Sequence, residues 1–280
     1  MIPAFSNLRT TNTQMQPAIK MALRVVRQGS DYLKAHFERQ STYGKDEGER
    51  RRQLERMEQS IYDNFKEQLE KAYKDHHIAP LNESDAGEHE KSWHIFPLLG
   101  RDNFLRGLPE FALALAQKKQ NRTENLLIVQ PITGEEYSAS RGHGAALNSR
   151  RVRTSEIRQI SQSAIATNLL DQARHSEHAP LWGEMAAMLA HDAALVRSSG
   201  CVLLDIARVA AGNLDAAVVF RPEPVDLALG VPLAMESGAL TGDFSGNPST
   251  DTARHLVTAN PKLFREVLKT LHPFRARLPR

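Results

Sequence analysis

Residues 93–104 read Trp-His-Ile-Phe-Pro-Leu-Leu-Gly-Arg-Asp-Asn-Phe, and this stretch decides the fold. An apolar run ends at Pro97, and Gly100 favours a tight turn. The apolar residues 111–116 follow shortly afterwards, so a strand, a loop and further sheet are expected. Because α/β enzymes place their sites at strand ends, the stretch predicts an α/β protein with a site at this turn.

The composition is that of an ordinary globular chain. Its 280 residues suit one large domain or two tightly joined subdomains, with 41% hydrophobic and 25% charged residues. The formal charge of +3, from 36 basic and 33 acidic residues, is too balanced to indicate nucleic-acid binding. No nucleic-acid motif accompanies the local arginine clusters, so direct binding to nucleic acid is not expected.

The cysteine content and the lengths of the apolar runs indicate the cellular compartment. Cys201 is the single cysteine, so no disulfide forms within the chain, as suits a reducing cytosol. No apolar run approaches the ~18 residues of a membrane span, and no signal peptide is indicated. We therefore expect a cytoplasmic protein without membrane association.

Apolar spacing predicts alternating helices and strands, which favours a layered α/β fold. Helices are expected over 17–37, 54–72, 181–190, 200–212, 225–237 and 261–271. Strands are expected over 111–117, 125–130, 135–139, 157–166, 214–220 and 238–246. The chain is divided into a flexible N-terminal extension (1–14), an α+β subdomain (15–150) and an α/β subdomain (151–280), the last two forming one compact unit.

The opening stretch resembles the signature of the inositol monophosphatase family, Asp-Pro-Leu-Asp-Gly-Thr-Thr-Asn-Phe. The matching residues are Pro97, Leu98, Gly100, Asn103 and Phe104. Further family patterns are matched by residues 141–148, 199–215 and 238–246, and the bacterial SuhB-type members have the most similar pattern. The resemblance begins at residue 15. It implies a layered α-β-α-β-α sandwich, usually assembled as a homodimer.

The resemblance also implies where the chemistry would lie. Active members hold Mg²⁺ with clustered carboxylates, and the ions polarise phosphate and activate water. Here Asp226 is the only ligand position that keeps its carboxylate. The other metal-ligand and water-activating positions are occupied by Arg51, Leu54, Asn82, Phe96, Leu99 and Arg101. Val219 stands where family members carry a sugar-contacting glutamate.

A lone carboxylate gives Mg²⁺ little reason to shed its water, so no catalytic residue and no cofactor are expected. The sequence predicts a pseudoenzyme that binds a protein partner or an anionic ligand. SuhB-type relatives suggest transcription regulation or antitermination, with NusA and RNA polymerase as partners. The alternative is a Mg²⁺-dependent inositol-1-monophosphatase. A different reaction that uses Arg101, Asp102 or Asp226 also stays open.

The replacement residues suggest their own chemistry. Arg51 or Arg101 would fill the metal space and pair with Asp226, or both would bind an anion without metal, or both would point to solvent. Cys201 is expected to be a packed thiol. The pairs His89 and His94, and His175 and His178, lack a zinc pattern and are expected in solvated loops.

Overall fold

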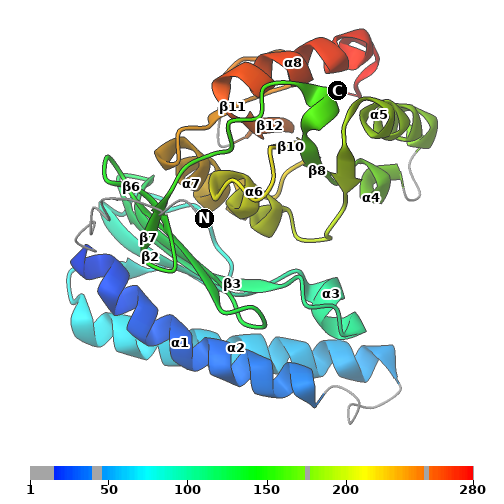
Figure 1. Ribbon diagram of the computed structural model, residues 1–280. Helices are drawn as coiled ribbons and strands as arrows, with labels where there is room; N and C mark the ends of the chain where they lie inside the picture. The colour runs from blue at the N-terminus through cyan, green and yellow to red at the C-terminus, as the bar shows by residue number, and fades with distance from the viewer. Residues whose placement is uncertain (1–15, 40–45, 174–176, 249–251, 280) are drawn as a thin grey trace, which may run out of the picture.

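The computed structural model describes residues 16–39, 46–173, 177–248 and 252–279. Within these residues the chain forms two sheets and three helical layers, stacked as α-β-α-β-α (Figure 1). The expected layered sandwich is therefore confirmed. The expected N-terminal extension and most of the loop after the first helix lie outside the described residues. No described helix is both long and apolar enough to cross a bilayer.

The first sheet has the strand order β1-β2-β3-β4-β5-β6-β7, with β1 parallel to β2 and the other neighbours antiparallel. Its strands are β1 (His77–Ile78), β2 (Lys91–Leu99), β3 (Ala112–Lys119), β4 (Arg122–Gln130), β5 (Glu135–Ser140), β6 (Gly144–Leu147) and β7 (Arg150–Val152). The strands expected over 111–117 and 125–130 are confirmed as β3 and β4, which form an antiparallel hairpin.

Two long helices, α1 (Pro17–Glu38) and α2 (Glu47–Ala72), cover one face of this sheet (Figure 1). Side chains alternate along a strand, so Leu113 and Leu115 of β3 face these helices while Ala114 and Ala116 face the other way. Asp46 begins α2 by accepting a hydrogen bond from the Glu49 backbone N–H.

The middle layer lies between the two sheets and contacts both (Figure 1). It consists of α6 (Val202–Ala210), the π-helical turn η3 (Asp226–Gly230) and α7 (Val231–Glu236). Leu204 and Ala207 of α6 pack on the first sheet, whereas Ile206 and Val209 pack on the second.

The second sheet has the order β11-β12-β10-β8-β9, in which β8, β9 and β10 are parallel and β12 is antiparallel to both neighbours. Its strands are β8 (Ala164–Thr167), β9 (Leu195–Arg197), β10 (Ala216–Phe220), β11 (Leu240–Gly242) and β12 (His255–Ala259). The outer face is covered by α4 (Leu169–Ala173), α5 (Ala179–Asp192) and α8 (Pro261–Leu271). The remaining elements are α3 (Arg101–Arg106) and the 3₁₀ turns η2 (Ile160–Gln162) and η4 (His272–Arg277).

Three expectations need correction. The strand expected over 157–166 is mostly a surface segment, because Ser163 Oγ donates to the Ile160 carbonyl and closes the turn η2 before β8 begins. The single helix expected over 225–237 is split into η3 and α7. Pro232 has no N–H to donate, and the Ala228 carbonyl accepts from Thr123 Oγ1 instead. The loop after β2 carries the short helix α3, and β12 was not expected at all.

Candidate functional site

A cavity of about 800 Å³ lies where β2 ends, α6 begins and β10 runs into η3. The seven residues assigned from the family resemblance all line it: Arg51, Leu54, Asn82, Phe96, Leu99, Arg101 and Asp226. They come from α2, the loop after β1, β2, α3 and η3, so segments more than 170 residues apart meet here. Val219 is buried in β10 and is not part of the lining.

Gly100 makes the turn that shapes the cavity floor. Its φ is +80°, and a Cβ at this position would lie 2.6 Å from the Glu110 carbonyl oxygen. Only glycine fits both conditions, because side chains disfavour this backbone region and no space is left for one. The turn predicted from the sequence is therefore confirmed, and it directs Arg101 to the cavity rim.

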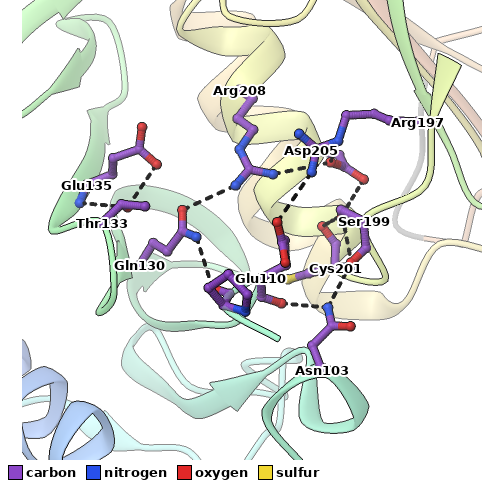
Figure 2. A network of polar contacts seen from close by, with 11 residues as sticks. Asn103, Glu110, Gln130, Thr133, Glu135, Arg197, Ser199, Cys201, Asp205 and Arg208 are labelled. Atoms are coloured by element: carbon purple, nitrogen blue, oxygen red, sulfur yellow. Dashed lines mark hydrogen bonds and ion pairs between the residues drawn. The ribbon is translucent and has the colours of Figure 1, made fainter. Parts of the chain in front are cut away.

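A network of polar contacts fixes this turn against the start of α6 (Figure 2). Asn103 Nδ2 donates to the backbone carbonyls of Glu110, at 2.7 Å, and Ser199, at 2.8 Å. Ser199 Oγ donates to Asp205 of α6 at 2.6 Å, and that carboxylate also faces Arg197 and Arg208. The network joins α3 to α6 and thereby sets the shape of the cavity.

The two arginines at the assigned positions do not pair with Asp226. Arg101 Nη2 lies 3.1 Å from Glu58 Oε2, while Arg51 Nη2 lies 2.9 Å from Glu47 Oε1 on the exposed side of α2. Among the described residues Asp226 forms no ion pair, and its Oδ2 accepts only the Glu223 backbone N–H, at 2.8 Å. The expected pairing of Arg51 or Arg101 with Asp226 is therefore wrong.

Arg101 pairs with Glu58, which the sequence did not indicate as a residue of the site. Its side chain is 3% exposed, and its Oε1 has no hydrogen-bond partner. Burial raises the pKa of Glu58 to about 7, against the opposing attraction of Arg101. A signal was present in the sequence, since Glu58 interrupts the apolar face formed by Leu54, Met57 and Ile61.

Asp226 and Cys201 lie in the deeper wall. Burial raises the pKa of Asp226 to about 8, although the Glu223 N–H bonded to its carboxylate opposes the shift. Burial also raises the pKa of the Cys201 thiol to about 12, so this cysteine is a packed, protonated group at the N-cap of α6. The expectation of a packed thiol is confirmed.

The loop over 82–84 forms another wall and is held from behind by β2 and β3. His94 Nδ1 lies 2.8 Å from the Glu83 carbonyl oxygen, and Lys118 Nζ donates to the Ser84 carbonyl. His94 is buried within β2, and burial lowers its pKa to about 4, so the ring is neutral. The expectation of a solvated loop histidine is wrong for His94. A buried imidazole fits there because Ser92 Oγ and the Glu83 carbonyl satisfy both ring nitrogens.

The other histidines take different places. His89 stacks on His77 with ring centroids 3.6 Å apart. His178 is the N-cap of α5, and His175 lies outside the described residues. In the part of the chain that the structure describes, no three His, Cys, Asp or Glu side chains are placed to hold a metal ion.

The donor set at the assigned positions does not fit Mg²⁺. This cation requires several hard oxygen ligands in near-octahedral geometry. Phe96 and Leu99 place hydrocarbon in the lining, and Arg101 places a positive charge there. Asp226 is left as the one carboxylate at these positions, and a single carboxylate does not supply the set of oxygen ligands that Mg²⁺ requires.

Comparison with known proteins identifies the family. The model of the inositol monophosphatase family matches residues 14–275. Nus factor SuhB of Pseudomonas aeruginosa is 31% identical over 92% of this chain and 97% of its own. Nus factor SuhB of Escherichia coli K12 is 27% identical over 92% of this chain and 96% of its own.

Solved structures show the same fold. An IMPase from Thermotoga maritima superposes with a TM-score of 0.77 at 22% identity, covering 94% of this chain and 99% of its own. The extragenic suppressor protein SuhB from Bartonella henselae gives a TM-score of 0.77 at 22% identity, covering 91% and 98%. The chain belongs to the inositol monophosphatase family.

Proposed function

We propose that this protein acts by binding a partner or ligand and does not hydrolyse phosphate esters. The observation that carries the proposal is the lining of the cavity at the end of β2. Phe96 and Leu99 stand where active members of the family would hold metal, and the Arg101 guanidinium contacts Glu58. Losing one electrostatic stabiliser costs roughly 10²–10³ in rate, so losing most of them removes metal-assisted hydrolysis.

The proposed biological role is in transcription. Relatives that match over almost the whole chain are Nus factors. From the resemblance to SuhB-type members we propose NusA and RNA polymerase as the class of partner here, with a regulatory or antitermination role. A homodimer in the cytoplasm stays a prediction that accompanies this proposal.

The alternative is a Mg²⁺-dependent inositol-1-monophosphatase. The family fold and the retained Asp226 favour it, whereas the exchanged lining residues oppose it. The test is release of phosphate from inositol 1-phosphate with excess Mg²⁺, with Asp226→Asn as the comparison variant. We expect no Mg²⁺-stimulated release from either protein. Stimulated release that Asp226→Asn abolishes would replace the proposal with the alternative.

The partner is tested separately with purified components. Purified NusA and RNA polymerase are titrated against the full-length protein by calorimetry, and saturable binding to either is the expected result. Absence of binding to both would remove the transcription role while leaving the non-hydrolytic cavity unaffected.

The predicted anion site at Arg51 and Arg101 needs refinement. Each guanidinium already contacts a glutamate, so an incoming anion would have to displace Glu47 or Glu58. Binding of an anion to these two residues stays part of the proposal. Arg221 of the same cavity is better placed, because it carries no ion pair among the described residues.

A further inference from the structure

Arg221 is the arginine of the cavity that carries no ion pair among the described residues. It follows the last residue of β10 and is exposed at the cavity rim. Its guanidinium lies over the Phe220 ring, with Cζ 5.3 Å from the ring centroid. An aromatic face holds an arginine side chain in place and leaves its N–H donors available.

The backbone of Arg221 is strained. Its φ is +48°, in the left-handed region that residues with a side chain rarely adopt. The Arg221 N–H donates to the Arg254 carbonyl at 2.7 Å, which fixes the backbone in this conformation. Strain of this kind persists where the surrounding structure imposes it, and it is concentrated at ligand sites.

The cavity lining holds more acidic than basic side chains, which disfavours a ligand with several negative charges. Arg51, Arg101 and Arg221 are accompanied by the carboxylates of Glu55, Glu83, Asp102 and Glu223, in addition to Asp226. A polyanion such as a bisphosphate would meet more negative than positive charge. The repulsion scales with the ligand's charge, so a ligand with a single negative charge meets much less of it while it contacts Arg221.

The cavity also has an apolar wall. Leu99, Leu105 and Val202 line it and are partly exposed. The volume of about 800 Å³ lies within the range of small-molecule sites, roughly 300–1,000 Å³. A highly hydrated polyol would gain little from this wall, whereas an apolar group would be removed from water.

We propose that the cavity binds, without metal, a small carboxylate with an apolar body, whose carboxylate is held by Arg221 and whose body packs on Leu99, Leu105 and Val202. The inference rests on the proposed binding function and names the ligand class for it. A planar guanidinium can hold a carboxylate through two parallel hydrogen bonds.

The test is calorimetric titration of the full-length protein with butyrate, octanoate and 1-octanol. Each buried methylene strengthens binding about fourfold, so octanoate should bind at least tenfold more tightly than butyrate. Arg221→Gln should weaken octanoate at least tenfold while leaving 1-octanol nearly unchanged. Arg265→Gln is the matched control, because Arg265 is exposed on α8 outside the cavity lining.

A second variant separates function from folding. Arg221→Gly relieves the left-handed backbone, so it should raise the melting temperature and still abolish the preference for octanoate over 1-octanol. The inference is overturned if octanoate does not bind, or if Arg221→Gln and Arg265→Gln weaken it equally. Mg²⁺-stimulated hydrolysis of inositol 1-phosphate would instead contradict the proposed function, so the two failures are distinct.

Discussion

Two buried carboxylates, Asp205 and Glu58, differ in their surroundings: Asp205 belongs to the polar network that fixes the turn at Gly100, whereas Glu58 lies beside the cavity. Asp205 accepts from Ser199 Oγ at 2.6 Å and faces Arg197 and Arg208, within a segment that matches the family pattern. Among the described residues Glu58 has one ion pair, to Arg101, and no hydroxyl donor such as Ser199; one oxygen of each carboxylate, Glu58 Oε1 and Asp205 Oδ1, has no hydrogen-bond partner. The polar network that positions the turn is kept, whereas the residues that would perform chemistry on it are exchanged.

The largest expected effect on stability concerns the polar network around the Gly100 turn. Asn103→Ala leaves the half-buried carbonyls of Glu110 and Ser199 without their donor, which should lower the free energy of unfolding by about 2–3 kcal/mol. Urea denaturation measures the change. The exposed Asn64→Ala on α2 is the control and should change stability by less than about 0.5 kcal/mol. Equal effects would mean that the network does not stabilise the turn.

Glu58 should make stability depend on pH. Its pKa is raised from 4.5 to about 7 in the folded protein, so the folded state holds the proton more tightly than the unfolded chain. The free energy of unfolding should therefore fall by about 2–3 kcal/mol between pH 5 and pH 8 through this group.

Glu58→Gln should remove that part of the slope. Asp226, whose pKa is also raised, contributes a slope of the same sign that the variant keeps. Urea denaturation at pH 5 and pH 8 compares the wild type, Glu58→Gln and, as the control, Glu70→Gln at an exposed position of the same helix. A slope that is unchanged in Glu58→Gln would show that the carboxyl is not buried as described.

Arg101→Gln should change the pH dependence of stability in the opposite direction from Glu58→Gln, and by a smaller amount. Arg101 stabilises the ionised form of Glu58, so its removal raises the Glu58 pKa further and steepens the fall in stability towards pH 8. Because the Arg101 side chain is 45% exposed, the additional loss should be only about 1 kcal/mol. Arg106→Gln on the same helix is the control, and a slope in Arg101→Gln no steeper than in Arg106→Gln would contradict the pairing.

Features encoded by neighbouring residues were predictable from the sequence. The glycine turn at Gly100 follows from local chemistry and the helix α8 from apolar spacing, and both were expected. The gathering of residues 51, 82, 96 and 226 at one cavity followed from the family resemblance. No local pattern joins such distant segments.

The missed features depend on tertiary contacts. Whether Arg101 meets Glu58 or Asp226 is decided by how α2 packs on β2, which periodicity does not specify. His94 was expected in a loop because a polar segment precedes it in the sequence. It is buried in β2 instead, where Ser92 Oγ of the same strand and the Glu83 carbonyl of the preceding loop contact its two ring nitrogens. The backbone conformation of Arg221 is fixed by a hydrogen bond to Arg254, thirty-three residues away.

The most direct test of the central claim is a calorimetric titration of the protein with Mg²⁺ at pH 7.5, with inositol 1-phosphate present and absent. The exchanged lining predicts no saturable Mg²⁺ binding in either condition, and no difference between the wild type and Asp226→Asn. Saturable Mg²⁺ binding that inositol 1-phosphate strengthens and Asp226→Asn removes would contradict the account.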